Sequence, residues 1–216
     1  MSSVKLVFIS DTHGLHHNLK LGSGDILIHC GDFSRRDSLE SVEDFARFMA
    51  RQDFKHKIVI AGNHDWCFED QRREQAEAVL RDHAIYYLND SGVQLDGLNF
   101  WGSPVQPAFM NWAFNRERGS DIRRHWALVP DKTDVLITHG PVFGILDRCR
   151  SGHRAGCEDL LATVQRIKPR IHACGHIHES YGQIEKEGIL FLNTSNLDEH
   201  YRLANSPIRY ELKYQS

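Results

Sequence analysis

Five short groups of acidic, imidazole and amide side chains recur along the chain, and their types suit metal-assisted chemistry. Carboxylate, imidazole and amide groups bind Mn²⁺, Fe, Zn²⁺ or Mg²⁺. The groups are Asp11-Thr12-His13, Gly31-Asp32, Gly62-Asn63-His64-Asp65, Thr138-His139-Gly140 and Gly175-His176-Ile177-His178. Because none of them contains a cysteine, the set predicts an oxygen and nitrogen metal site rather than a structural zinc site built on thiolates.

The spacing within the groups allows chelation. Asp11 and His13 lie two residues apart, as do His176 and His178, and such pairs point to one side of an extended strand end. A single carboxylate with two oxygens, as in Asp32, can bridge two cations. Each of these arrangements therefore supplies a part of a metal site.

Seven candidate ligands are too many for one ion but suit two ions about 3.5–4 Å apart. The seven are Asp11, His13, Asp32, Asn63, His139, His176 and His178. Two ions at this distance produce hydroxide near neutral pH and hold both the attacking and the leaving oxygen of a phosphoryl displacement. His64 is placed to protonate a leaving oxygen, with Asp65 available to orient its ring.

The elements that position these groups are strands, because each group follows a short apolar run. The runs are residues 7–10, 26–30, 58–61, 135–137 and 171–174. Near-continuous apolar runs of this length are typical of strands that are buried on both faces. Since the carboxyl ends of such strands line one crevice of an open sheet, we expect the five groups to converge.

The rest of the chain predicts helices and hairpins around these strands. Helices are expected over residues 38–52, with Asp37 and Glu40 as a capping box, over 69–82, and over 158–168 before Pro169. Hairpins are expected at Asp96-Gly97 and at residues 186–188, and further strands at 85–88 and 208–214. The pattern predicts an α/β protein of two packed mixed sheets flanked by helices, in a single domain over residues 1–216.

Composition limits the classes of partner. The chain has 216 residues, is 41% hydrophobic and carries a formal net charge of -3, so no basic field favours long nucleic acid or an anionic membrane. No apolar stretch has the length of a membrane-spanning helix, and no signal peptide is recognisable. The five cysteines form no CxxC pair, which favours reduced thiols and a cytoplasmic location. Nothing here indicates the oligomeric state.

Three features of the sequence each allow two interpretations of their role. The aromatic segment 104–126 is either core beneath a long connection or a lid over the crevice. His16 and His17 either reach a substrate phosphate or lie on a surface loop. The guanidinium groups of Arg148, Arg150 and Arg154 either grip a substrate phosphate or face solvent.

The motifs DTH, GD, GNHD, THG and GHIH, in this order, resemble those of the calcineurin-like metallophosphoesterases over nearly the full chain. Residues 58–64, 138–147 with 154–161, and 175–182 further resemble the branch of metallophosphoesterase-domain (MPPED-type) phosphodiesterases. That branch tends to carry Glu where this chain has Asp65. Some of its members lack the first histidine of the final pair, whereas this chain has His176.

The resemblance implies a four-layer α/β/β/α sandwich and a role for each candidate. It assigns Asp11, His13 and His178 to one metal, Asn63, His139 and His176 to the second, Asp32 as the bridge, His64 as the catalytic histidine and Asp65 as its partner. It also implies two divalent ions, with Mn²⁺ as the expected metal and Fe, Zn²⁺ or Mg²⁺ as alternatives.

The function implied is a phosphoester hydrolase with a metal-bound hydroxide nucleophile. A phosphodiesterase acting on small phosphodiesters or cyclic nucleotides is expected, with a small-molecule phosphoester as its partner. The alternatives are a phosphomonoesterase of the same fold and a non-catalytic metal-binding scaffold. A protein phosphatase is disfavoured because Phe33-Ser34-Arg35-Arg36 follows Asp32 in place of the GDYVDRG continuation. A repair nuclease would need a DNA-capping domain, for which the chain has no length.

Overall fold

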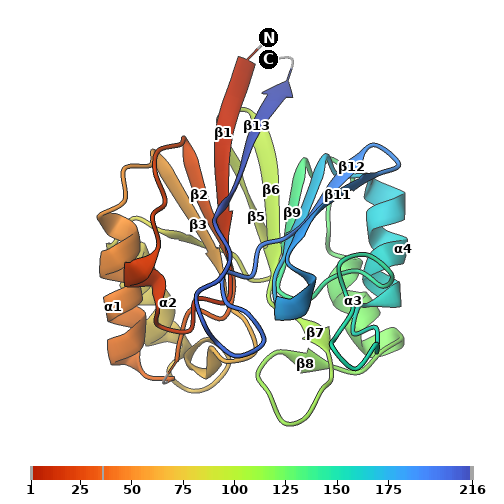
Figure 1. Cartoon of the computed structure of the whole chain (residues 1–216), viewed down its shortest axis with the longest axis horizontal. Coiled ribbons are helices and arrows are strands. Elements are labelled where there is room, and N and C mark those ends of the chain that lie inside the picture. Colours follow the sequence, from red (N-terminus) through yellow and green to blue (C-terminus); the bar gives the residue numbers. More distant parts are fainter. Residues whose placement is uncertain (1, 36, 215–216) are drawn as a thin grey trace.

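The computed structural model describes residues 2–35 and 37–214. Its first sheet has five strands in the order β13-β1-β2-β3-β4, of which β13 is antiparallel to β1 and the other neighbours are parallel. These strands are β1 (Ser2–Ile9), β2 (Ile26–Cys30), β3 (His56–Ile60), β4 (Tyr86–Tyr87) and β13 (Ile208–Tyr214). Helices α1 (Leu39–Ala50) and α2 (Arg73–Asp82) cover its outer face (Figure 1).

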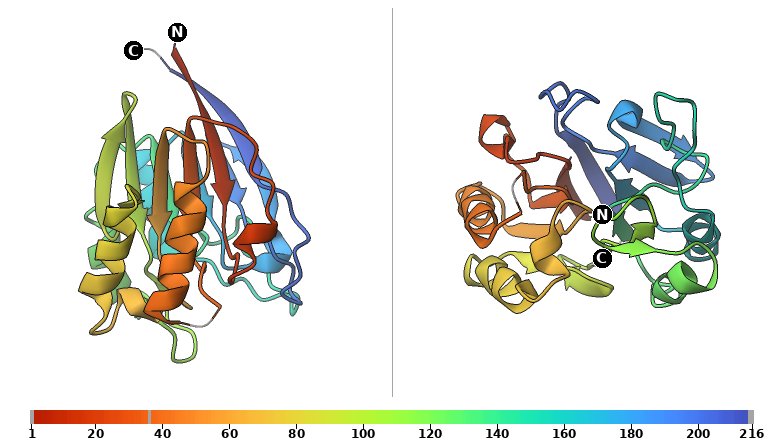
Figure 2. Two further views of the ribbon diagram at one scale, coloured as in Figure 1. Left: turned by 90° about the vertical axis from the view of Figure 1, so that its left-hand side faces the viewer. Right: turned by 90° about the horizontal axis from the view of Figure 1, so that it is seen from below.

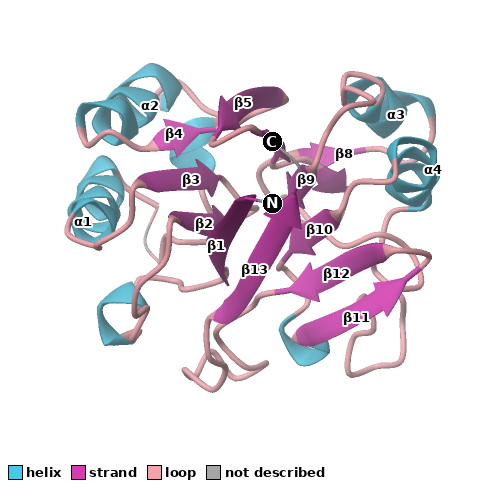
Figure 3. Ribbon diagram, turned by 90° about the horizontal axis from the view of Figure 1, so that it is seen from above, coloured by secondary structure: helices cyan, strands magenta, loops and turns pink. Residues whose placement is uncertain are grey.

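The second sheet has six strands in the order β11-β12-β10-β9-β6-β5. Its central strands are parallel, and its edge strands β11 and β5 are antiparallel to their neighbours. The strands are β5 (Ser91–Leu95), β6 (Leu98–Ser103), β9 (Val135–Thr138), β10 (Ile171–Cys174), β11 (Gly182–Lys186) and β12 (Ile189–Asn193). Helices α3 (Ser120–Trp126) and α4 (Glu158–Ile167) cover the outer face of this sheet (Figure 3).

Three apolar layers hold the two sheets and two helix pairs together. Along β2, Leu27 lies in the layer beneath α1 and α2, whereas Ile28 lies between the sheets. Along β9, Leu136 lies beneath α3 and α4, whereas Ile137 faces the other sheet. Alternate residues of one strand are thus buried on opposite faces, which explains the near-continuous apolar runs. The predicted four-layer α/β/β/α sandwich is confirmed.

The local predictions differ from the structure mainly at element ends. Ser38, not Asp37, is the N-cap of α1, and its partner in the capping box is Ser41 rather than Glu40. The helix predicted over 69–82 begins only at Arg73, after the 3₁₀ helix η2 (Trp66–Phe68). At the predicted hairpin, Asp96 and Gly97 have φ angles of 49° and 82°, as a type I′ turn requires.

Segment 104–126 contains more regular structure than its sequence suggested. It forms the short parallel pair β7 (Gln106–Pro107) and β8 (Asn115–Arg116), followed by α3. Phe114 and Trp126 are buried and fill the core, while Phe109 is exposed. No helix within residues 2–35 and 37–214 combines the length and the apolar character needed to cross a membrane.

Two histidines within central strands are buried and bonded to motif threonines. His29 of β2 lies 3.0 Å from the Thr12 hydroxyl, and His172 of β10 lies 2.8 Å from the Thr138 hydroxyl. Because the Thr138 hydroxyl donates to the Gly140 carbonyl, it must accept from His172 Nε2. Burial lowers the pKa of each histidine to about 3. These imidazoles are therefore neutral at neutral pH and orient the loops that carry the metal-ligand candidates.

The depressed pKa of His172 predicts acid destabilisation. The unfolded chain binds a proton at this side chain near pH 6.5, whereas the folded chain resists protonation down to about pH 3. Stability is therefore fully present above pH 6.5 and falls as the pH drops, by about 2 kcal/mol per such histidine at pH 5. Urea unfolding in EDTA at pH 7 and pH 5 should show a smaller loss in His172→Gln than in the unsubstituted protein. Equal losses in both would contradict the prediction.

Candidate metal centre

The loops after five strands meet at one end of the molecule, opposite to the paired termini (Figures 1 and 2). The first sheet supplies the groups after β1, β2 and β3, and the second supplies those after β9 and β10. Three clusters of possible ligands share members: Asp11, His13 and His178; His13, Asp32 and His64; and Asp32, His139 and His176. Within each cluster the ligand atoms lie within 4.8 Å of one another. The predicted convergence of the five groups is therefore seen in the structure.

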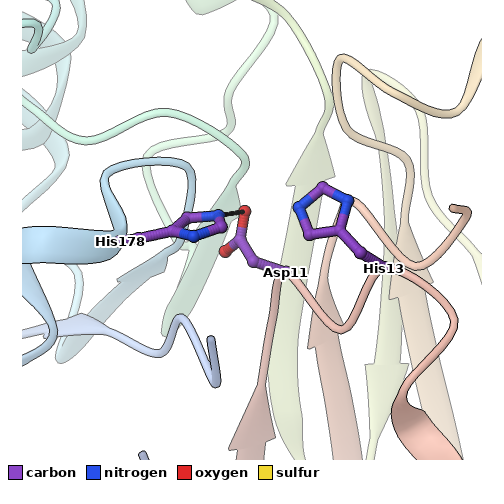
Figure 4. A group of neighbouring side chains, drawn as sticks. All are labelled: Asp11, His13 and His178. Carbon is purple, nitrogen blue, oxygen red and sulfur yellow. Dashed lines mark ion pairs between the residues drawn. The ribbon is translucent and has the colours of Figure 1, made fainter. Parts of the chain in front are cut away.

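One half of the centre is built by Asp11, His13 and His178. In Figure 4 the Asp11 carboxylate lies between the two imidazoles, and its Oδ1 is 3.4 Å from His178 Nε2. The Asp198 carbonyl accepts a hydrogen bond from His178 Nδ1 at 2.9 Å, which leaves Nε2 to face Asp11. The Ser195 hydroxyl donates to Asp11 Oδ2 at 2.8 Å. A backbone carbonyl and a hydroxyl thus orient two of the three candidate ligands.

The other half is built by Asn63, His139 and His176. Asn63 Oδ1 lies 2.9 Å from His139 Nε2, and the ring centroids of His139 and His176 are 4.9 Å apart. The Cys30 carbonyl accepts from His139 Nδ1 at 2.9 Å, so that Nε2 faces the centre of the site. The loops after β3, β9 and β10 must all be in place to assemble this half.

Asp32 joins the two halves. Its Oδ2 lies 3.4 Å from His139 Nε2, 3.7 Å from His13 Nε2 and 4.0 Å from His64 Nε2. Its Oδ1 accepts the His64 backbone N–H at 2.8 Å. Burial alone would raise the pKa of Asp32, but the imidazoles of His139 and His13 outweigh it and lower the pKa. The ionised carboxylate therefore stands where a ligand shared by two cations would be needed.

The chemistry of these donors fits divalent metal ions. His139 Nδ1 carries the proton donated to Cys30, so a neutral ring presents a lone pair at Nε2 toward the oxygens of Asn63 and Asp32. Lone pairs that converge in this way require a cation between them, or a proton on the ring. Burial would lower the pKa of His139, but Asp32 raises it to about 9, so metal binding would displace a proton. His13 Nε2 is also buried and has no hydrogen-bond partner among the described residues.

Four of the candidate ligands have strained backbones. The φ angles of Asp11, His13, Asp32 and His176 are 52°, 40°, 57° and 68°, in the left-handed region that non-glycine residues rarely adopt. Such residues cost roughly 1–3 kcal/mol each and cluster at functional sites, where the surrounding fold holds them. A Cβ at Gly62 would lie 2.2 Å from Asp32 Oδ1, so this position requires glycine.

His64 and Asp65 have separate surroundings. The His64 ring contacts His13 at 4.8 Å and Trp112 at 4.2 Å between centroids, and its side chain is 24% exposed. Both oxygens of buried Asp65 accept backbone N–H groups, from Asp32 at 2.9 Å, Gly62 at 2.8 Å and Ser34 at 3.0 Å. This placement corrects the expectation that Asp65 orients the His64 ring, because Asp65 instead fixes the loops that carry Asp32 and Asn63.

A model of the family described as calcineurin-like phosphoesterase matches residues 4–180. The chain belongs to this family. Metallophosphoesterase domain-containing protein 1 of Homo sapiens is 35% identical over 232 residues, which cover 96% of this chain and 71% of the relative. A UPF0046 protein of Caenorhabditis elegans is 38% identical over 216 residues, which cover 95% of this chain and 74% of that protein. The resemblance inferred from the motifs is confirmed, and the chain is expected to hydrolyse a phosphoester.

Solved structures support the same fold at low sequence identity. One crystal structure is 14% identical with a TM-score of 0.70 and covers 89% of this chain and 90% of that chain. A Thermus thermophilus protein is 10% identical with a TM-score of 0.61, over 89% of each chain. GAP50, the anchor in the inner membrane complex of Plasmodium, is 10% identical with a TM-score of 0.56, over 98% of this chain and 82% of its own.

Two cavities adjoin the candidate metal centre of this calcineurin-like phosphoesterase. One, of about 290 Å³, is lined by His13, Leu15, Arg35, His64, Leu197 and Tyr201. The other, of about 160 Å³, is lined by Pro107, Ala108, Phe109, Arg118, Gly140, Cys149, His153, Ala155, His176 and Ile177. Each contains at least one candidate metal ligand and one guanidinium group. Each half of the candidate centre therefore borders on open space, at His13 in one half and at His176 in the other.

The cavity residues were only partly predicted. Arg35 and Arg118 line the cavities, whereas Arg154 pairs with buried Asp147 at 2.7 Å. Arg35 was not predicted, although it stands only three residues after Asp32 and so close to a candidate metal ligand. Arg118 lies within segment 104–126, so the part of that segment preceding α3 does reach the crevice.

His16 and His17 do not face the centre between the sheets. Both rings contact Asp44 of α1 instead. Burial lowers the pKa of His16 to about 4. The interpretation in which these two residues reach a substrate phosphate has no support in this geometry.

Proposed function

We propose that this calcineurin-like phosphoesterase is a dinuclear-metal phosphodiesterase that acts on small phosphodiesters, including cyclic nucleotides. The observation that carries the proposal is a pair of separate cavities, one lined by His13 and His64 and the other by His176. A phosphodiester has two ester groups, and in-line displacement directs the leaving group away from the attacking oxygen. One cavity can hold the leaving group while the other holds the retained group. A monoester would need only one of them.

The cavities also differ in chemistry. The first combines the aromatic ring of Tyr201 with the guanidinium of Arg35. The second combines the apolar side chains of Phe109 and Ile177 with the guanidinium of Arg118. A flat ring that carries an anionic phosphate matches both, because aromatic faces stack on rings and guanidinium groups bind phosphate oxygens. This combination supports a nucleotide-like diester.

His64 is the residue we assign as general acid. Its ring is partly exposed, lines the larger cavity and lies beside the His13 ring. A proton held at His64 can pass to a leaving oxygen in that cavity, which avoids release of an alkoxide. The Trp112 ring, 4.2 Å away, limits how far the imidazole can turn.

Two divalent ions would be held by Asp11, His13 and His178 on one side and by Asn63, His139 and His176 on the other, with Asp32 shared. When bound, such ions supply a nucleophile near neutral pH and neutralise charge on the phosphoryl oxygens. We propose Mn²⁺ as the working metal, since carboxylate, amide and imidazole donors suit it. All five cysteines are free, which supports a reducing, cytoplasmic environment.

Hydrolysis of bis(p-nitrophenyl) phosphate beside p-nitrophenyl phosphate tests the proposal. Protein stripped of metal with a chelator should be inactive, and restored Mn²⁺ should return turnover of the diester above that of the monoester. Faster turnover of the monoester would move the assignment to phosphomonoesterase. Bound metal with no hydrolysis of either compound, or of cyclic nucleotides, would indicate a scaffold.

A further inference from the structure

We infer that His16, His17 and Asp44 form a further metal site, separate from the centre between the sheets, that binds one zinc-like divalent ion. The three side chains come from the 3₁₀ helix η1 (His16–Asn18) and from α1. They supply two imidazoles and one carboxylate, the donor types of open zinc sites. The inference does not depend on phosphoesterase activity.

The donor atoms already converge. His16 Nε2 lies 3.1 Å from Asp44 Oδ2, and His17 Nε2 lies 2.9 Å from Asp44 Oδ2 and 3.1 Å from Oδ1. One ligand atom from each of the three residues lies within 4.8 Å of the other two. Both histidines present the same ring nitrogen to one carboxylate. Small shifts toward a shared ion would bring all three donors to bonding distance.

Aromatic packing holds the two rings in place. The His16 ring lies 5.4 Å from the Phe45 ring and 4.9 Å from the Phe48 ring, both on the same helix as Asp44. The His17 ring lies 5.5 Å from that of Phe48. His16 is 1% exposed, so its position is set by the core. Two of the three ligands are therefore ordered before an ion arrives, which reduces the entropy lost on binding.

The site is open on its other side. The side chains of His17 and Asp44 are 48% and 56% exposed, so an ion can enter from solvent. A cavity of about 350 Å³ adjoins it, lined by Gly14, His16, Phe33, Arg35, Ser41 and Asp44. This space can hold the water that completes a four-coordinate site with three protein ligands.

A bound ion would link the loop after β1 to α1. Backbone hydrogen bonds join Leu15 to Thr12 and Asn18 to Leu15, so η1 continues directly from the loop that carries His13. An ion that binds only the folded state adds to its stability. A bound ion would thus restrict the movement of the loop after β1, which also contributes His13 to the centre between the sheets.

Zinc content after dialysis tests the inference, with His17→Ala and Asp44→Asn as variants. Each should hold one Zn²⁺ fewer per chain than the unsubstituted protein and should bind that ion at least about tenfold more weakly. Saturating Zn²⁺ should raise Tm by about 5–10 °C more in the unsubstituted protein than in the variants. His83→Ala is the matched control, since His83 also faces a carboxylate of α1, Glu43 at 3.6 Å, but without a second imidazole.

Equal zinc content in all four proteins would overturn the inference. The same loss in His83→Ala as in His17→Ala would also overturn it, because binding would then be adventitious. Matching circular dichroism and Tm in EDTA establish that the variants fold. The ions retained by His17→Ala report the centre between the sheets, whereas the difference from the unsubstituted protein reports this site. Loss of zinc from the site of His16, His17 and Asp44 can therefore be distinguished from loss of metal from the centre between the sheets.

Discussion

Asp32→Asn should reduce phosphodiester hydrolysis by on the order of 10³-fold or more, because removal of groups that only orient metal ligands already costs 10–100-fold. Asn keeps the shape of the side chain but removes the charge that faces His13, His64 and His139 at 3.7, 4.0 and 3.4 Å. If Asp32 bridges two ions, both sites weaken together. Bound Mn²⁺ should fall below two ions per chain.

Steady-state kcat/KM and the metal content of the dialysed protein measure this effect. Asp25→Asn is a suitable control, since Asp25 immediately precedes β2 whereas Asp32 follows its other end. The control should hydrolyse the substrate as the unsubstituted protein does. Activity in Asp32→Asn within about tenfold of the control would contradict a role as a metal ligand.

His64→Ala should lower kcat by about 10²–10⁴-fold for diesters with an alkoxide leaving group, because general acid catalysis contributes this range. For the p-nitrophenyl diester the loss should be smaller, since p-nitrophenolate leaves without a proton. The metal content should stay unchanged. A leaving-group comparison therefore separates the loss of an acid from the loss of a metal ligand.

The measurement is kcat for both substrates beside metal content, with His56→Ala as the control. His56 begins β3, and His64 follows the other end of that strand. The two substitutions therefore remove the same type of side chain, an imidazole, at opposite ends of β3. An equal loss for both leaving groups, accompanied by loss of metal, would show that His64 acts as a ligand. Its Nε2 lies 4.0 Å from Asp32 Oδ2, so this outcome is physically accessible.

Local patterns were sufficient to predict the strands and the groups that follow them. In β2 and β9, both faces of each strand are buried, which produces an apolar run that ends where the polar group begins. The capping of α1 was predicted less well because Asp37, Ser38, Glu40 and Ser41 offer competing patterns within five residues. Which side chain caps a helix depends on where its first turn starts.

The role of Asp65 depended on contacts between loops. Its carboxylate accepts the N–H of Asp32 and of Ser34, more than 30 residues earlier in the chain, and sequence proximity to His64 suggested a different partner. Tyr201 gave no signal at all, because a lone aromatic in a polar loop resembles any surface residue. Its ring centroid lies 4.9 Å from that of His13 only because the chain returns past β12 to the loop end of β1.

The ligand types, their order and their positions at strand ends can be predicted from the amino-acid sequence alone, because they follow from apolar periodicity and donor chemistry over a few residues. Three-dimensional packing was needed to place Asp32 between the two halves, Asp65 against the loops that it fixes, and Arg35 and Arg118 at the cavities. Strand register and the packing of two sheets set the distances between these residues. Those contacts join residues far apart in the chain, so short-range patterns do not encode them.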